Sequence, residues 1–414
     1  MSDYEIRQLG FSPDKFQEIE AYLQATIDKK RASGIVLCLA RETDDIIYRS
    51  VGLSSIEDKL ACTPQTLYRI ASLTKPVITV ALMMLLEKGL CAVDDPVEKW
   101  LPEVREMQVL SNPQTTGDDT SEQSKAIFEP IKEVMTLKHL LNHTSGLCYD
   151  FNAPTKIKQE YSRSRIYEAC ETTADFAHKL LQLPLAFQPG SGYFYGFSTD
   201  VLGHIVELIS GQPLDEYLQQ HLFEPLNMVN SGFSVAHDET LQVASMYGAS
   251  TNEEGQHQLK LLEAYASNAV FNAPKIFSGG GGMLSTPDDY MKFLRMLMNG
   301  GLGSKSAILQ ENSIEMMTKN YLQANQMPYN IGCGINYDTE GYGFGFNLKV
   351  LLNPRTKDYV VSEGEYGWAG STNTYAWIDS RRDLAVAVFS QYVPFACYPL
   401  EQELKKLIYD AMVY

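Results

Sequence analysis

The chain has 414 residues, enough for two domains or for one domain that carries a large insertion. Hydrophobic residues make up 44% and aromatic residues 11% of the chain, as expected of a well-packed globular protein. The formal net charge of −17 argues against nucleic acid and anionic membranes as partners, because both would be repelled.

The first residues and the cysteines give information on the compartment. Residues 1–16 contain neither a positively charged region nor an apolar core, so we expect no secretory signal. The seven cysteines are an odd number and form no C-x-x-C pair, which is typical of a reducing cytoplasm. No run of eighteen apolar residues is present, so no membrane span is expected. We therefore predict a cytoplasmic protein.

The N-terminal part of the chain predicts a helix followed by a β-hairpin. Ser12 and Pro13 have the pattern of a helix start, and an amphipathic segment follows to Lys30. Two β-rich runs, 34–42 and 44–52, are joined by a polar turn around Thr43 to Asp45.

The segment 68–89 contains the first candidate catalytic residues. From Pro76 to Leu86 only Thr79 is polar, which predicts a helix buried on all sides and ended by Gly89. Ser72 and Lys75 are three residues apart, so their Cβ atoms lie about 5–6 Å from each other on one helical face. A desolvated lysine can take the proton of a serine hydroxyl.

The S-x-x-K pattern alone does not establish a catalytic site, because the chain contains it twice. The other copy begins at Ser12 and is fully explained as a helix start. For Ser72 itself, a plain N-cap remains an open alternative from this segment alone.

The middle of the chain is predicted to be mostly helical. Residues 109–130 form a polar loop of the kind that often overhangs a site, although a surface insertion without a role is the preferred interpretation. A short helix from Thr136 is expected to end at Gly146. Its His139 and His143 have the spacing of a metal pair, but no third ligand is evident, so we expect packed or capping histidines and no metal.

Two further features lie before the C-terminal strands. A turn at residues 189–192 delivers Tyr195 to the start of a helix, and a tyrosine there can serve as a base or proton shuttle. Four consecutive glycines, 279–282, allow a close approach of backbones, while a phosphate-binding loop is excluded because no G-K-[ST] follows.

The C-terminal part returns to β-rich runs at 342–353, 370–379 and 383–391 and finishes with a helix. We predict an α/β (α+β) fold with an antiparallel sheet built from both ends of the chain, flanked by the terminal helices, and an inserted helical domain. The predicted sheet domain comprises residues 1–62 and 275–414 and the helical domain 63–274, with the active site in the cleft between them.

Several motifs in the same order resemble the serine β-lactamase-like superfamily, specifically the class C β-lactamase branch and the family VIII carboxylesterases. The resemblance spans about residues 34–391. It rests on S-L-T-K at Ser72 to Lys75, HTSGL at His143 to Leu147, Tyr195 after a Pro-Gly turn, the glycine run before a helix start, and Trp368-Ala369-Gly370 at the start of a late strand.

The resemblance implies a role for each matching residue. Ser72 resembles the acylated nucleophile, Lys75 the amine that activates it, and Tyr195 the tyrosine that exchanges protons with Ser72 and the leaving group. The backbone N–H groups of Ser72 and Ser371 are then expected to form the oxyanion hole. No metal or organic cofactor is implied.

Two departures from the β-lactamase pattern point to the substrate. Phe197 stands where these enzymes have the asparagine of Y-x-N, and Trp368-Ala369-Gly370 stands in place of K-T-G. Both changes remove polar recognition of penicillins and make the predicted substrate contacts more apolar. Small-molecule esters or thioesters with a hydrophobic part fit such a cleft better.

We therefore predict a carboxylesterase that acts through an acyl-Ser72 intermediate. The alternatives are an acyltransferase that uses the same intermediate, a β-lactamase or D-amino-acid peptidase, and a binding protein without catalysis. An α/β-hydrolase is set aside because the chain has no G-x-S-x-G and no histidine beyond His257. The sequence does not indicate the oligomeric state.

Overall fold

A computed structural model of the chain describes residues 3–41, 46–111, 126–236, 241–251, 254, 257–262, 270–272, 274–303 and 306–413. The predicted turn at Thr43 to Asp45 lies outside these residues, as do residues 112–125 of the predicted polar loop.

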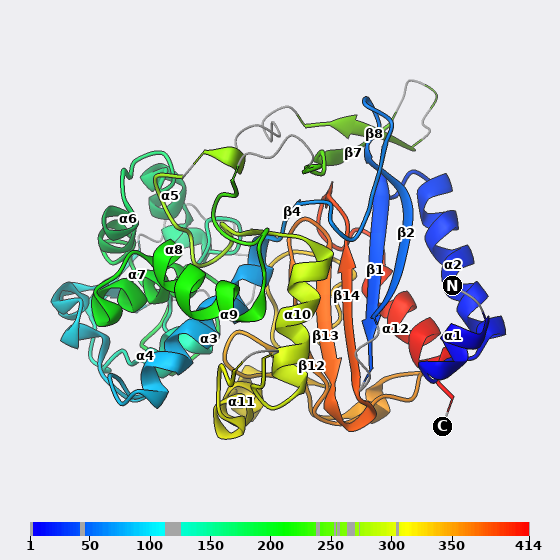
Figure 1. Cartoon of the computed structure of the whole chain (residues 1–414). Coiled ribbons are helices and arrows are strands. Elements are labelled where there is room, and N and C mark those ends of the chain that lie inside the picture. The colour runs from blue at the N-terminus through cyan, green and yellow to red at the C-terminus, as the bar shows by residue number, and fades with distance from the viewer. Residues whose placement is uncertain are drawn as a thin grey trace.

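The central feature is an eight-stranded sheet with the strand order β10-β11-β12-β13-β14-β1-β2-β3 (Figure 1). Strand β1 pairs antiparallel with both β14 and β2, and its residues are buried throughout. Because β1 and β14 come from opposite ends of the chain, the predicted sheet built from both ends is confirmed. The strands are β1 (Gly34–Ala40), β2 (Ile46–Ser55), β3 (Leu60–Ala61), β10 (Tyr342–Phe344), β11 (Lys349–Leu351), β12 (Tyr366–Gly370), β13 (Thr374–Asp379) and β14 (Leu384–Phe389).

Helices cover both faces of this sheet. Helix α2 (Pro13–Asp28) packs against α12 (Leu400–Ala411) and against β2, with the short α1 (Asp3–Gln8) beside them. Helix α10 (Pro287–Met298) packs on β1, β13 and β14, on the opposite side of the sheet in Figure 1. A sheet buried on both faces explains why β1 and β14 are apolar without alternation.

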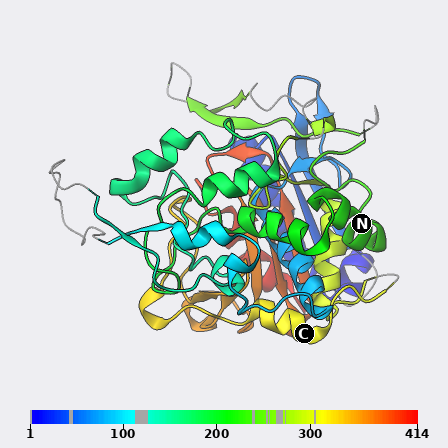
Figure 2. The same ribbon diagram turned by 90° about the vertical axis from the view of Figure 1, so that its left-hand side faces the viewer.

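A mostly helical body packs beside the sheet, as predicted, and lies in front of it in Figure 2. Its central contacts join α3 to α7 and α7 to α4, α6 and α8. Its helices are α3 (Thr74–Glu87), α4 (Leu137–Leu141), α5 (Thr155–Ser164), α6 (Thr173–Leu180), α7 (Ser198–Ser210), α8 (Leu214–Leu218) and α9 (Glu224–Leu226), with α11 (Glu311–Thr318) against α3. The residue boundaries of two separate domains stay a prediction.

Helix α3 has the predicted character. All of its residues from Thr74 to Leu85 are buried, and Gly89 has a positive φ of 72° just after its end. Helix α4 differs from the prediction, because it ends at Leu141 and His143 already adopts a positive φ of 56°.

Short strand pairs bring distant segments together near α3. Strand β4 (Tyr68–Arg69) pairs with β9 (Leu284–Ser285), which places the residues before Ser72 beside those after the glycine run. Strands β5 (Gln108–Leu110) and β6 (Phe128–Pro130) pair at the two ends of the predicted polar loop. A third small sheet has the order β15 (Tyr392–Val393), β7 (Tyr247–Thr251) and β8 (His257–Leu261).

The described residues also include the short 3₁₀ helices Ala71–Leu73, Val97–Lys99, Pro102–Glu106, Ala324–Gln326, Pro354–Thr356 and Ser380–Arg382, and a π-helical turn at Gln219–Phe223 between α8 and α9. Among the described residues, no helix combines the length and the apolar character needed to cross a membrane.

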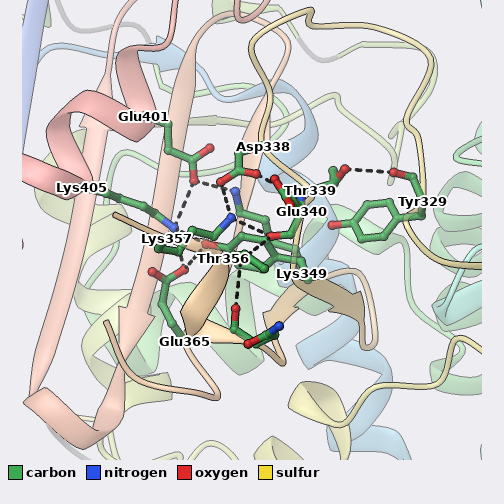
Figure 3. Close-up of polar contacts among 12 residues, drawn as sticks. Tyr329, Asp338, Thr339, Glu340, Lys349, Thr356, Lys357, Glu365, Glu401 and Lys405 are labelled. Atoms are coloured by element: carbon green, nitrogen blue, oxygen red, sulfur yellow. Dashed lines mark hydrogen bonds and ion pairs between the residues drawn. The ribbon is translucent and has the colours of Figure 1, made fainter. Parts of the chain in front are cut away.

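A buried ion network ties α12 to the sheet (Figure 3). Lys405 Nζ lies 2.5 Å from Glu365 Oε1, and Lys349 Nζ lies 2.7 Å from Glu401 Oε1, with all four side chains at most 5% exposed. Lys349 also lies 4.4 Å from the ring centroid of Tyr337. Because Tyr337 packs edge-on against Trp368, the network supports the wall of the cavity described below.

Candidate active site

Ser72 lies in the 3₁₀ turn Ala71–Leu73 that leads directly into α3. The N-cap of α3 is Leu73, so Ser72 is not the plain N-cap that the sequence left open. Ala71 has a positive φ of 45°, which is uncommon for a residue other than glycine. Such backbone strain is often found at functional sites, and here it immediately precedes the candidate nucleophile.

Lys75 is fully buried and its amine contacts Ser72. The Nζ atom lies 3.2 Å from Ser72 Oγ, 3.0 Å from Tyr149 Oη and 2.6 Å from the carbonyl oxygen of Gly280. Burial lowers the pKa of Lys75 to about 7, against a smaller opposing effect of Asp200. A substantial fraction of the amine is therefore neutral near pH 7 and available as a base.

Tyr195 lies beside this amine. Its ring centroid is 4.6 Å from Lys75 Nζ, and its side chain is buried against the rings of His143 and Trp368. Burial raises the pKa of Tyr195, while the neighbouring polar groups of Ser72 and Trp368 lower it to a smaller extent. The phenol is neutral at rest and lies where a proton can pass between it and Ser72.

The end of β12 lies next to the turn that carries Ser72. Thr372 Oγ1 donates to the carbonyl oxygen of Arg69 at 2.8 Å, and Thr374 Oγ1 donates to that of Ile70 at 3.2 Å. At Gly370 a Cβ would lie 2.3 Å from the Ile70 carbonyl oxygen, so the close approach requires glycine. These contacts bring Ser371 and Ser72 to the same cavity. Their backbone role in an oxyanion hole stays a prediction.

The segment Trp368 to Gly370 ends a strand, whereas the sequence predicted the start of one. Strand β12 already begins at Tyr366 and stops at Gly370, because residues 371–373 form the turn into β13. The pairing of Trp368 with Ala376 and of Gly370 with Thr374 fixes the register of this turn over Ser72.

Ser72 opens into a cavity of about 640 Å³, a volume typical of small-molecule sites. Asp150 is the one charged side chain among the described residues that line it. Of the predicted substrate contacts, Phe197, Trp368 and Ala369 line the cavity, and among the described lining residues Gly370 is not found. The aromatic part of the lining consists of Tyr149, Phe151, Tyr167, Tyr195, Phe197, Tyr337, Trp368 and Phe395.

Two residues around Lys75 were not singled out in the sequence. They are Tyr149, which contacts its amine, and Asp200, which is buried nearby. Gly280, which also contacts the amine, belongs to the predicted glycine run. The glycine run did indicate a close approach, and it occurs: a Cβ on Gly280 would lie 2.3 Å from Asp200 Oδ2 and 2.9 Å from Tyr149 Oη. Tyr149 and Asp200 carry no local signal that separates them from a core tyrosine and a helix-start acid.

The two histidines with metal-pair spacing have the expected packing and capping contacts. His139 completes a capping box with Thr136 at the start of α4, and His143 is buried against Tyr195. Burial lowers the pKa of His143 well below its usual value, so its ring is neutral. No group of three ligating side chains suited to a metal ion is found in the described parts of the chain.

Comparison with known proteins gives consistent matches. A family model described as Beta-lactamase matches residues 19–407. Esterase EstB from Burkholderia gladioli is 28% identical over 385 residues, covering 90% of this chain and 89% of its own. ML-236A carboxylate methylbutanoyltransferase mlcH from Penicillium citrinum is 29% identical over 420 residues, covering 95% and 94%.

Among solved structures, the unliganded selenomethionyl derivative of simvastatin synthase LovD from Aspergillus terreus has a TM-score of 0.79. It is 23% identical, and the match covers 97% of this chain and 98% of that protein. This likeness concerns the fold, and it agrees with the predicted α/β (α+β) architecture.

Proposed function

This chain belongs to the beta-lactamase family, and we propose that it is a serine esterase that transfers the acyl group of an apolar ester or thioester to Ser72 and then to water. The main support is the 3.2 Å contact between Ser72 Oγ and the fully buried amine of Lys75. A buried ammonium without a carboxylate in direct contact is costly, and such an arrangement is typical of a group used in catalysis.

Acylation begins with the neutral form of Lys75. Lys75 Nζ takes the proton of Ser72 while Oγ attacks the carbonyl carbon of the substrate, and the carbonyl oxygen becomes an oxyanion. The backbone N–H groups of Ser72 and Ser371 stabilise that oxyanion, with a further contribution from the N-terminal end of α3. Losing one such donor typically reduces the rate about 10²–10³-fold.

Collapse of the tetrahedral intermediate breaks the bond to the leaving group. A leaving alkoxide takes a proton from Tyr195, and Lys75 returns a proton to Tyr195, whereas a thiolate is a weaker base and departs as the anion. This order suits the resting site, because burial keeps the Tyr195 phenol protonated until a stronger base forms beside it. Water then attacks the acyl-serine through the same groups in reverse.

The cavity favours substrates with apolar groups. Phe197 and Trp368 occupy the positions at which β-lactamases of the class C branch have polar groups, and both line the cavity. The Phe197 ring packs on that of Tyr149 with centroids 4.5 Å apart, which leaves an aromatic surface facing the candidate acyl site. An anionic β-lactam carboxylate has no cationic partner among the described lining residues, whereas an apolar acyl chain gains about 25 cal/mol per Å² buried.

An acyltransferase is the second candidate. It is favoured by the similarity to mlcH, which carries the name of a methylbutanoyltransferase and aligns with nearly the whole chain. A cavity of about 640 Å³ also has room for an acyl group together with a second small molecule. In that case an acceptor alcohol takes the place of water, and the chemistry at Ser72 is the same.

The test compares turnover of p-nitrophenyl butyrate by the unmodified chain, Ser72→Ala and Ser12→Ala. Ser12 belongs to the second S-x-x-K sequence and is a matched control, since it lies at the start of α2 without a side-chain capping bond. We expect Ser72→Ala to lose at least about 10³-fold in kcat/KM and Ser12→Ala to keep full activity. Equal activity of Ser72→Ala and the unmodified chain would refute the proposal.

The same substrate with an added alcohol separates the two candidates. An esterase releases butyrate at the same rate with or without the alcohol. An acyltransferase accumulates the acyl-enzyme in water and forms butyrate ester only when the alcohol is present.

A further inference from the structure

Asp200 is a buried carboxylate that the mechanism above does not use. It lies in the first turn of α7 with 1% of its surface exposed. Its Oδ1 atom accepts hydrogen bonds from Ser278 Oγ at 2.6 Å and from the backbone N–H of Gly280 at 3.0 Å. Its Oδ2 atom has no hydrogen-bond partner among the described residues. Burial raises the pKa of Asp200, while the charge of Lys75 and the two donors on Oδ1 oppose that effect and favour the ionised form.

Gly280 connects this carboxylate to Lys75. Its N–H donates to Asp200, and its carbonyl oxygen accepts from Lys75 Nζ at 2.6 Å, the shortest of the three contacts of that amine. The turn is closed by backbone hydrogen bonds from Gly281 and Gly282 to the carbonyl oxygen of Ser278, and Asp200 adds a side chain that binds both Ser278 and Gly280.

Asp200 also supplies a negative charge near Lys75. Among the described residues, the other titratable groups that face this amine are Tyr149, Tyr195, His143 and Cys333. Burial raises the pKa of both tyrosines and of the Cys333 thiol and lowers that of His143, so all four are neutral near pH 7. Asp150 lines the cavity but is exposed, so its charge is screened by solvent.

We propose that Asp200 is a positioning residue of this site, which holds the Gly280 carbonyl on Lys75 and supplies the negative charge that offsets the burial of the ammonium. The inference rests on the proposed function of Lys75 as the base for Ser72. Without Asp200 the hydrogen bond from Lys75 Nζ to the Gly280 carbonyl oxygen would weaken. The ammonium would also lose its proton at lower pH.

The test measures the rate at which a fluorophosphonate labels the serine, as a function of pH, in Asp200→Asn. Asparagine keeps an oxygen that can accept from Ser278 and Gly280, so the charge is removed and the acceptor remains. A unit charge two hydrogen bonds away at an effective dielectric of about 20 shifts a pKa by roughly 1–2 units. We expect the acidic limb of the labelling rate to move to lower pH by at least about one unit.

In consequence, labelling of Asp200→Asn at pH 6, relative to its own plateau, rises about fivefold over the unmodified chain, from roughly a tenth to roughly half of the plateau. Asp289→Asn is the matched control, because Asp289 is equally buried but lies in the first turn of α10, where its carboxylate contacts Asn230, Ser231 and Lys292. Its acidic limb is expected to stay in place. A purely structural role of Asp200 would lower the plateau without moving the limb.

Gly280→Ala tests the positional part of the inference independently of the charge. Its Cβ would lie 2.3 Å from Asp200 Oδ2, so the turn must shift and carry the carbonyl away from Lys75. We expect a plateau rate at least tenfold lower with a folded chain, as checked by circular dichroism.

This inference alone would be overturned if the acidic limb of the labelling rate lay at the same pH in Asp200→Asn as in the unmodified chain. It would also be overturned if Gly280→Ala were labelled as fast as the unmodified chain. A lack of labelling at Ser72 in the unmodified chain would overturn the proposed function and, with it, the inference.

Discussion

Replacement of Lys75 by methionine is expected to abolish catalysis and to make the protein more stable. Lys75 is fully buried, and burial lowers its pKa from 10.5 to about 7. In the unfolded chain the amine is protonated at its ordinary pKa, so the folded state at neutral pH holds a proton less tightly than the unfolded state. Burial of this amine therefore lowers the free energy of unfolding by its full amount below pH 7. This destabilisation disappears as the pH rises towards 10.5.

The magnitude follows from the size of the pKa shift. A decrease of about 3.5 units corresponds to about 5 kcal/mol at 1.36 kcal/mol per unit. Methionine has a similar length and carries no charge, but it leaves the Gly280 carbonyl oxygen without its donor, which costs about 1–3 kcal/mol. The net expectation is a gain of about 2–4 kcal/mol in the free energy of unfolding.

Urea unfolding at pH 7 measures this gain, and Lys405→Met is the matched control. Lys405 is equally buried but contacts Glu365 at 2.5 Å and Glu401 at 3.4 Å. Removing it leaves the buried Glu365 carboxylate without its lysine, while Glu401 keeps Lys349 at 2.7 Å, and should destabilise the chain by about 3–5 kcal/mol. A loss of stability in Lys75→Met similar to that in Lys405→Met would refute the idea that burial of the Lys75 ammonium destabilises the folded chain.

Three further predictions follow from the same groups. A pH series of kcat/KM should show a rise of about tenfold between pH 6 and a plateau above pH 8, because burial lowers the pKa of Lys75 to about 7 and the neutral amine is the base. Lys75→Arg should abolish both the activity and this pH-dependent rise. The double variant Phe197→Asn, Trp368→Lys should acylate with nitrocefin at least tenfold faster and hydrolyse p-nitrophenyl butyrate more slowly, because it restores polar recognition of a carboxylate; steady-state assays of both substrates check this. Burial raises the pKa of Glu401, but the adjacent buried lysines outweigh this effect and lower the pKa overall. The stability that Glu401 contributes is therefore present above about pH 4.3 and lost as the pH falls through its lower folded pKa. Urea midpoints at pH 3 and pH 6 should differ less in Glu401→Gln than in the unmodified chain.

The sheet and the Ser72 helix were accessible from sequence because their signals are local. Strands β1 and β14 are continuous apolar runs, and a sheet covered on both faces requires that pattern. The three-residue spacing of Ser72 and Lys75 predicts that their side chains meet, and the observed contact is 3.2 Å, with Ser72 in the 3₁₀ turn that leads into α3. The resemblance in ordered motifs added Tyr195, which lies 4.6 Å from the amine by its ring centroid.

The remaining parts of the site depend on contacts that no local pattern encodes. Tyr149 is 74 residues away from Lys75 in the sequence, and Gly280 is 205 residues away, yet both contact its amine. Asp200, at the start of α7, has the same appearance as any acid that complements a helix dipole, and only the packing of α7 on α3 places it near Lys75. Tertiary packing also explains the early end of α4, because His143 turns away from the helix to pack on Tyr195.

The most direct test of the central proposal is peptide mapping of the acyl adduct after a brief reaction with p-nitrophenyl butyrate. We expect one butyryl group per chain on the peptide that contains Ser72, released on further incubation and missing from Ser72→Ala. An adduct on a different residue, or an equal adduct in Ser72→Ala, would contradict the assignment of Ser72 as the nucleophile.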